Sequence, residues 1–261
     1  MTTTSYALGH TPEEYERLRV QARRWESATG RLLDQIGLAP GAGGTCDQTC
    51  ALPRGPEGQE VTDAFRFVHR TLTGDGSITA RITSFTGEKL AGPGKTDPGL
   101  VPWAKAGLLV KDGSKPGSTY AAVMLTGAHG VRMQYDYVHD VAGPTGRRTP
   151  QWLRLTRDVN TITAAASPDG SRWTTVGSTT LDLPNAVEVG LFATSPQYAE
   201  VSSAVFGVSG ASGGPSTATA VFDHVAFGGT TAASWKTQQV GGPSSTPEVT
   251  GTDAAEEQRS G

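Results

Sequence analysis

The sequence contains little of what marks several large classes of protein. Only two of its 261 residues are cysteine, and lysine plus arginine (22) do not outnumber aspartate plus glutamate (25). The net charge of −3 gives no basic surface of the kind that binds nucleic acid, so no nucleic-acid partner is expected. No apolar run reaches the roughly 18 residues of a membrane-spanning helix. We therefore expect no membrane insertion by this chain.

The amino terminus also lacks a recognisable export signal. Its first residues, MTTTSYALGH, have neither the basic region nor the apolar region of a secretory signal peptide. The chain by itself is thus expected to be soluble and cytoplasmic. A family resemblance described below favours an extracytoplasmic location, so the sequence leaves the compartment open.

The two cysteines, Cys46 and Cys50, lie close together in the segment CDQTC. A structural zinc site needs four ligands, and no further cysteine or histidine follows at the spacing of such a site. The thiols are interpreted as having no function, with a disulfide between them as the alternative. No metal and no cofactor is predicted.

Residues 11 to 36 show the pattern of an amphipathic helix. Thr11 can cap it, Pro12 suits its first turn, and Glu14 completes a capping box with Thr11. Gly37 is a typical residue at which a helix ends. The apolar residues recur at helical spacing on one broad face: Tyr15, Leu18, Ala22, Trp25, Leu32 and Ile36.

A different pattern follows from Phe65 to Phe227. Short runs rich in β-branched and aromatic residues are closed by clusters such as GDG (74–76) and SPDG (167–170). Such clusters form tight turns because they tolerate a positive φ or preset the backbone. About ten strands without helices between them predict a mainly β fold, an antiparallel two-sheet jelly-roll sandwich, preceded by one N-terminal α-helix.

These patterns divide the chain into four segments. Residues 1–40 form the helical segment, and 41–61 read as a linker because they show neither helical nor strand periodicity. Residues 62–228 form the β-sandwich domain. Residues 229–261 are rich in glycine, serine, threonine and proline and are predicted to be a disordered tail.

The opening helix, with its ending RLLDQIGLAPG, resembles the N-terminal helix of class I S-adenosylmethionine-dependent methyltransferases. In that family the next element is a strand that carries a glycine-rich cofactor turn. Here GAGGTCDQTC follows, with no strand and no acidic residue before its glycines, so Gly41, Gly43 and Gly44 do not match the cofactor loop. The segment is interpreted as a methyltransferase-like stub without the enzyme.

Residues 63 to 227 resemble a bacterial family of concanavalin A-like, laminin-G-like sandwiches over nearly their whole length. The matching phrases include LTGDGSITARI, WAKAGLLVKDG, WLRLTRDVNTITAAASPDGSRWTTVG and VGLFATS. The family includes accessory C-terminal modules of β-xylosidases and soluble domains of transporter-permease-like proteins. The resemblance implies a β-sandwich with a concave sheet able to hold a ligand, and a membrane domain absent from this sequence as a partner.

Glycosidase chemistry needs two facing carboxylates. The only glutamates of the predicted β domain are Glu88, Glu188 and Glu200, and Glu188 reads as a solvent-facing strand position. No Gly-x-Ser-x-Gly motif occurs, so no enzymatic activity is predicted. Loop aspartates could ligate calcium, but they more often form Asx turns; the candidates are Asp75, Asp112, Asp136, Asp140 and Asp223.

Strand alternation indicates which polar residues could share a surface. In QWLRLTR, Leu153 and Leu155 point one way while Trp152 and Arg154 point the other. The candidate ligand-binding concave face consists of Arg81, Lys105, Gln134, Asp136, Trp152 and Arg154. The alternative is an ordinary solvated sheet face with cross-strand ion pairs. Trp103 and Trp173 follow turns and are interpreted as core plugs or turn covers.

Three functional hypotheses remain. The favoured one is a non-catalytic recognition module that binds an oligosaccharide or another extracytoplasmic ligand, detached from an ABC-transporter-permease-like protein. The second is a structural or protein-interaction domain, whose polar face meets a partner protein. The third is a methyltransferase remnant without its cofactor motif.

Overall fold

The computed structural model describes residues 52–92, 95–145, 149–203 and 209–241. The predicted helix at 11–36, the methyltransferase-like stub, Cys46 and Cys50 lie outside these residues. No helix within the described ranges is long and apolar enough to cross a membrane.

The described residues form a mainly β structure, as predicted, and all their strand pairs are antiparallel. The strands are β1 (Phe65–Gly92), β2 (Lys95–Pro98), β3 (Lys105–Lys111), β4 (Tyr120–Thr126), β5 (Val131–Tyr135), β6 (His139–Ala142), β7 (Gln151–Asp158), β8 (Thr161–Ser167), β9 (Thr174–Thr180), β10 (Ala186–Thr194), β11 (Tyr198–Ser203), β12 (Ser209–Gly214), β13 (Ser216–Thr231) and β14 (Lys236–Val240).

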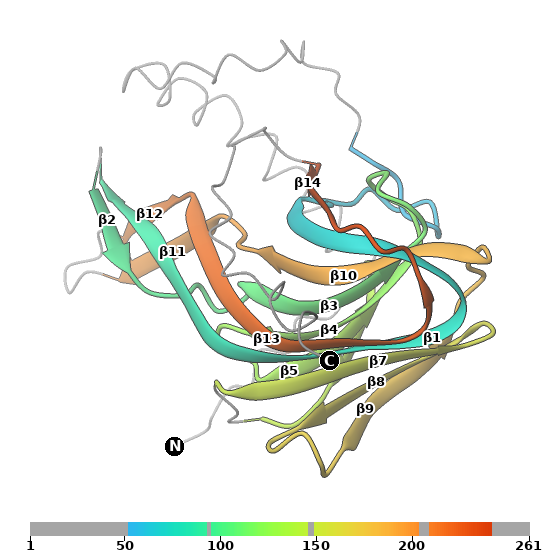
Figure 1. Ribbon diagram of the computed structural model, residues 1–261. Helices are drawn as coiled ribbons and strands as arrows, with labels where there is room; N and C mark the ends of the chain where they lie inside the picture. Colours follow the sequence, from blue (N-terminus) through green and yellow to red (C-terminus); the bar gives the residue numbers. More distant parts are fainter. Residues whose placement is uncertain (1–51, 93–94, 146–148, 204–208, 242–261) are drawn as a thin grey trace, which may run out of the picture. The chain divides into compact units, whose positions relative to one another are not determined.

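Twelve of these strands belong to one hydrogen-bonded sheet, and β11 and β12 pair separately. The main path runs β6-β5-β4-β3-β10-β1-β7-β8-β9, with β13, β14 and β2 also paired to β1. The first part of β1 pairs with β10 and β14, and its later part pairs with β7 and β13. Figure 1 shows β1 and β13 bending side by side from one layer into the other. The layers are therefore joined through β1 and are not two separate sheets.

The bend in β1 explains this difference from the prediction. The cluster GDG was interpreted as a turn that ends a strand, but the strand continues through it. Gly74 has a φ of 72°, and the pairing with β13 shifts register between Thr73 and Gly76. A Cβ on Gly76 would lie 2.4 Å from the carbonyl oxygen of Gly228. Glycine thus lets the two strands bend together without breaking their ladder.

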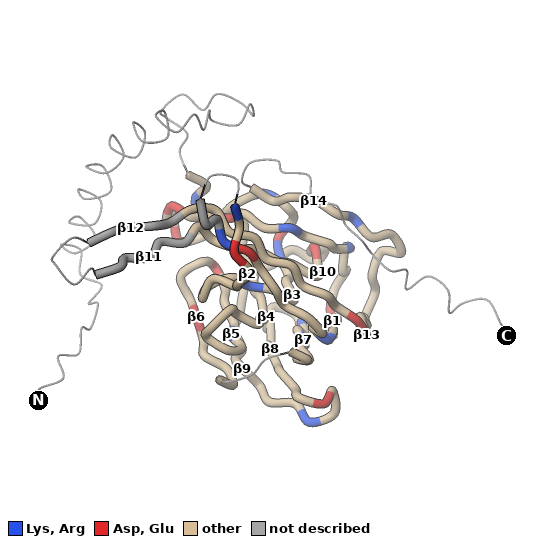
Figure 2. The backbone as a smooth tube through the Cα atoms, turned by 90° about the vertical axis from the view of Figure 1, so that its left-hand side faces the viewer, with Lys and Arg blue, Asp and Glu red and all other residues tan. Residues whose placement is uncertain are grey.

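The larger hydrophobic core, here called the inner core, lies between the β3–β4–β5 and β7–β8 layers. Leu153 of β7 and Leu108 of β3 are both fully buried members of it. A second cluster, the outer cluster, lies on the opposite face of β3 and β4 and consists of Phe65, Phe67, Leu109, Ala122, Met124, Phe192 and Val240. β4 has no charged residue, and β3 has them only at its ends (Figure 2). These strands are thus buried on both faces, as their nearly continuous apolar runs indicate.

Two predicted boundaries need correction. β14 lies within 229–261, where a disordered tail was predicted, and Phe65 pairs with Val240. Val240 is buried in the outer cluster, which gives this polar segment an apolar anchor. The end of the predicted linker is likewise ordered, because Arg54 and Glu60 form a β-bridge and Val61 is buried.

The β3–β4 ladder yields a first testable prediction. A Cβ on Gly107 would lie 2.1 Å from the carbonyl oxygen of Val123, a backbone atom that cannot move without disturbing the ladder. We expect Gly107→Ala to lower the free energy of unfolding by about 2 kcal/mol, measured by urea denaturation. Gly177→Ala is the matched control, because its nearest atom is the flexible Met133 sulfur at 3.0 Å. Equal stability of the two variants would contradict the prediction.

Candidate ligand-binding surfaces

The six predicted site residues do not share one surface. Ala106 of β3 and Leu153 of β7 both belong to the inner core, which lies between these strands. Because successive strand residues point to opposite faces, Lys105 lies on the outer side of β3 and Trp152 on the outer side of β7. The two surfaces therefore face away from each other. Lys105 and Gln134 lie on one, and Arg81, Trp152 and Arg154 on the other, while Asp136 lies in a turn.

The first surface is built around an exposed tryptophan. Trp103 is 41% exposed, and its ring packs against the His129 ring, tilted by 31° and with 3.9 Å between ring centroids. The Arg132 guanidinium carbon and the Lys105 Nζ lie 5.6 and 6.0 Å from the Trp103 ring centroid. We call this set the Trp103 cluster; it consists of Trp103, Lys105, His129, Arg132, Gln134 and Asp140.

A chain of hydrogen bonds holds the polar members of this cluster in place. Lys105 Nζ donates to Gln134 Oε1 at 2.7 Å, and Gln134 Nε2 donates to Asp140 Oδ2 at 2.6 Å. Arg132 Nε donates to Asp140 Oδ1 at 2.5 Å. Burial lowers the pKa of Lys105, with Asp140 opposing and Arg132 adding to this effect. An amide, two cations and a carboxylate thus lie beside one aromatic ring.

The second surface lies on the outer face of β1 and β7. Arg81 pairs with Asp223 through two hydrogen bonds and lies over the Trp152 ring, 5.5 Å from its centroid. The Arg81 side chain, through its hydrogen bonds, lowers the pKa of Asp223 to about 2. His224 meets the edge of the Trp152 ring. Arg81 is thus already paired with a protein carboxylate.

Arg154 continues this arrangement along β7. Its guanidinium lies 3.9 Å from the Trp173 ring centroid, and its Nε donates to Thr79 Oγ1 at 3.1 Å. The Trp173 indole N–H donates to the carbonyl of Gly170. An arginine therefore stacks on each of these two half-buried tryptophans, which resembles the solvated, ion-paired face that was the alternative interpretation.

Asp136 occupies a turn and not a strand face. It follows the end of β5, and both Asp136 (φ 45°) and Tyr137 (φ 72°) adopt the left-handed conformation. The Asp136 carboxylate accepts a hydrogen bond from the Tyr120 amide at 3.1 Å. Burial is the main cause that raises the pKa of Asp136. This hydrogen bond joins the β5–β6 turn to the start of β4, so it is a structural role, although not the local Asx turn that was expected.

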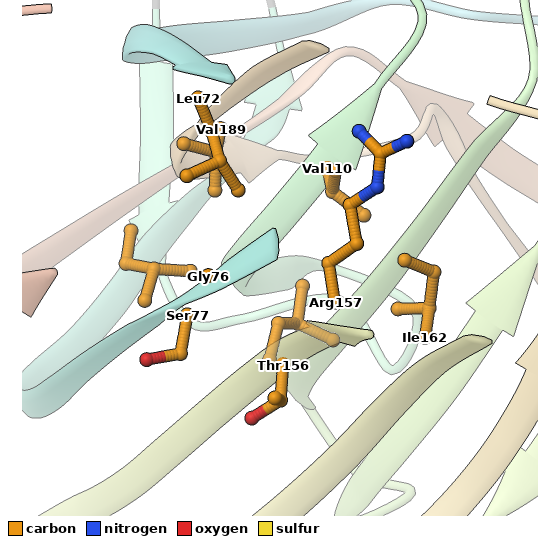
Figure 3. Close-up of a pocket in the computed structure, with 10 residues that line it drawn as sticks. Leu72, Gly76, Ser77, Val110, Thr156, Arg157, Ile162 and Val189 are labelled. Atoms are coloured by element: carbon orange, nitrogen blue, oxygen red, sulfur yellow. The ribbon is translucent and has the colours of Figure 1, made fainter. Parts of the chain in front are cut away.

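Two concave sites of the described structure lack the features of a ligand-binding pocket. A cavity of about 10 Å³ is lined by residues of β1, β3, β7, β8 and β10, and it has room for one water molecule at most (Figure 3). An open depression of about 380 Å³ has no aromatic ring; it is lined by Gly74, Asp75, Arg157, Val159, Asn160, Leu183 and Asn185. Arg157 donates to the backbone carbonyls of Val159 and Leu183 there.

Several carboxylates that were considered for catalysis or calcium binding form hydrogen bonds or ion pairs within the protein. Glu188 was predicted to face solvent, but its Oε2 lies 2.6 Å from Nδ1 of the buried His69. Asp75 accepts a hydrogen bond from the Val159 amide, and Asp140 and Asp223 pair with arginines. Within the described ranges, no three metal-ligating side chains come together.

Four members of the Trp103 cluster were not among the predicted ligand-binding residues: Trp103, His129, Arg132 and Asp140, the last of which was considered only as a calcium ligand. Arg132 could have been predicted as a site residue, because strand alternation places it on the same face of β5 as Gln134, opposite the face of Met133. Trp103 and His129 lie in loops at the ends of β3 and β4, where no strand period applies. Trp103 was interpreted as a core plug or a turn cover; its exposure excludes the core plug, and its contact with His129 of the β4–β5 loop fits the turn cover.

Comparisons with known proteins give only distant likenesses. No family model and no curated protein matches the chain. The fold is similar to a functionally unknown protein from Saccharomyces cerevisiae, with 14% identity and a TM-score of 0.41, over 67% of this chain and 80% of that one. It is also similar to a variant of the GH43 protein BlXynB from Bacillus licheniformis, with 12% identity and a TM-score of 0.33, over 46% of this chain and 24% of that one. Likenesses this distant assign no activity or ligand.

Proposed function

We propose that the β domain is a non-catalytic recognition module that binds an oligosaccharide at the Trp103 cluster. The observation that carries the proposal is the exposed indole of Trp103 beside a preformed set of polar side chains. A sugar ring presents an apolar face, which packs on an aromatic ring. Its hydroxyl groups lie at the edge of the sugar ring and need hydrogen-bond donors and acceptors. The cluster offers both in one place.

The polar groups keep capacity for a ligand. Lys105 uses one of its three N–H groups on Gln134, and Gln134 keeps a second amide N–H. Asp140 receives one hydrogen bond on each oxygen, so each oxygen can accept another. Sugar hydroxyls could therefore add donors and acceptors without breaking the existing bonds.

The cluster also has a rigid base. Met124 pairs with Arg132 and Ala122 pairs with Gln134, and both apolar residues are fully buried in the outer cluster. The polar side chains thus stand on strands that are fixed by a packed core. Such support reduces the conformational entropy lost when a ligand binds.

The proposal predicts that Trp103→Ala weakens oligosaccharide binding at least about 30-fold, because a central aromatic contact typically contributes 2 kcal/mol or more. Isothermal titration of the whole chain with xylotetraose, cellotetraose and laminaritetraose measures the effect. Trp235→Ala is the matched control, because Trp235 is also 41% exposed but lies on another part of the structure. Gln134→Ala should weaken binding as well, through the lost amide and the freed Lys105.

Two outcomes would contradict the proposal. Saturable binding that survives Trp103→Ala would place the ligand elsewhere, on the Trp152 surface for example. No binding to any oligosaccharide, together with a mass that rises with protein concentration or a partner that co-purifies, would favour the structural or protein-interaction domain.

A further inference from the structure

Arg70 lies against two aromatic rings that are themselves in contact. Its guanidinium carbon lies 4.3 Å from the Trp235 ring centroid and 4.8 Å from that of Phe227. The two rings meet edge to face with 5.5 Å between centroids. Phe227 also packs against the inner core, which holds one side of this cage in place.

The cage forms where the chain passes from one layer to the other. Arg70 belongs to the first part of β1, Phe227 to β13, and Trp235 to the connection between β13 and β14. The connection is tied to β1, because the Ala232 amide donates to the Thr71 carbonyl at 2.9 Å. Trp235 remains 41% exposed, and Arg70 is only partly buried, so solvent reaches the cage.

The hydrogen-bonding groups of Arg70 are unused. Among the described residues it has no carboxylate partner, and its Nε is buried without a hydrogen-bond acceptor. Arg66, four residues earlier on the same strand face, also has a buried Nε without an acceptor. Arg81, Arg132 and Arg157 contrast with these two, since each donates from Nε to an oxygen of the protein.

A guanidinium that packs against aromatic rings through its flat face keeps its N–H donors at its edge. That edge matches two oxygens of one anionic group in a bidentate arrangement. The Nε itself is buried, so the donors of Arg70 that a ligand can reach are its terminal Nη groups, which make no hydrogen bond to another described residue. The position of Arg66 adds a second positive charge on the same side of β1.

We propose that Arg70, held by Phe227 and Trp235, forms a second binding site, for an oxyanion group of a ligand. The group is a carboxylate or a phosphate, since both offer two oxygens at the spacing of the guanidinium fork. This site does not depend on the Trp103 cluster, and it takes an anionic ligand where that cluster takes a neutral sugar.

The test titrates the whole chain with sodium glucuronate and, separately, with inorganic phosphate, at constant ionic strength kept with sodium chloride. Glucose serves as the neutral counterpart of glucuronate. We expect saturable binding of at least one anion and none of glucose. Binding of glucuronate alone would assign a carboxylate, and binding of phosphate alone would assign a phosphate; either supports the site.

Variants locate the binding. Arg70→Gln should abolish it, and Arg70→Lys, which keeps a cation beside the rings, should weaken it at least about 10-fold because lysine cannot bind in a bidentate way. Arg154→Gln is the matched control, since Arg154 also stacks on a tryptophan but has a partner in Thr79. Unchanged binding in Arg70→Lys, or no saturable binding of either anion to the parent chain, would overturn the proposal. Trp103→Ala should leave anion binding intact, so this test and that of the oligosaccharide site can fail independently.

Discussion

Replacement of Asp63 by alanine is expected to lower the free energy of unfolding by about 3–5 kcal/mol, because it leaves a buried lysine without its counterion. Lys111 is 0% exposed. Its Nζ donates to Asp63 Oδ2 at 2.9 Å, to the Ser118 carbonyl at 2.8 Å and to the Tyr137 hydroxyl at 2.9 Å. Asp63 Oδ2 also accepts from the Gly117 amide and from the Tyr137 hydroxyl, so one carboxylate connects three segments.

The loss should depend on pH in a defined direction. Burial lowers the pKa of Lys111 below its ordinary value, and Asp63 is the largest influence that opposes this. Without Asp63 the pKa falls further, so the folded variant favours the neutral amine more than the unfolded chain does. The variant should therefore gain stability as pH rises toward the unfolded lysine value of about 10.4. The difference from the parent protein should be larger at pH 7 than at pH 9.5.

Urea denaturation at the two pH values measures this prediction. The matched control is the double variant Asp63→Leu/Lys111→Met, which removes both charges and should recover most of the loss. An Asp63→Ala variant as stable as the parent at pH 7 would contradict the account, because it would mean that other groups neutralise Lys111.

The residues that face the inner core could be predicted from the sequence where strands alternate. Leu153 and Leu155 of β7 were placed on the face opposite Trp152 and Arg154, and both are buried in the inner core. Alternation assigns two faces to each strand, but it does not say which faces of different strands meet. Lys105 and Trp152 were therefore grouped on one surface although the inner core separates them.

The course of β1 could not be predicted for a related reason. A glycine-rich cluster has the same local preferences whether it ends a strand or bends it. The decision is made by residues far away in the sequence, since β13 pairs with β1 on both sides of Gly74 and Gly76. The same limit applies to β14, whose pairing depends on Phe65 and not on its own polar residues.

For Glu188, strand alternation predicted the face of the strand correctly but not the surroundings of the side chain. It does point away from Val187 and Val189, which are buried in the inner core. The opposite face carries His69, which is 1% exposed, and the two side chains pair at 2.6 Å. Thr71 Oγ1 donates to Glu188 Oε1 at 3.1 Å, and Lys236 Nζ lies 3.4 Å from the same oxygen. Strand residues distant in sequence thus enclose a carboxylate that was predicted to face solvent.

We expect Glu188→Ala to lower the free energy of unfolding by about 3 kcal/mol, because it leaves a buried polar ring without its partner. His69 has no second partner to compensate, since its Nε2 is buried without a hydrogen bond in the described structure. Its ring is also held by Phe67, on which it stacks with 4.3 Å between ring centroids. Lys236→Ala is the matched control, with an expected loss below about 1 kcal/mol for an exposed ion pair.

The pH dependence of Glu188→Gln tests the same pair without a change of shape. Burial raises the pKa of Glu188, but the hydrogen bond and charge of His69, with help from Thr71 and Lys236, outweigh burial and hold the pKa below its ordinary value. A carboxylate with a lowered folded pKa stabilises the fold fully above the unfolded value of about 4.3, and the contribution is lost as pH falls through the folded pKa. Urea denaturation should therefore show a difference between parent and variant that shrinks below about pH 4. A difference that grows on acidification would mean that the carboxylate is held by burial alone, and the His69–Glu188 pair would then not stabilise the sheet.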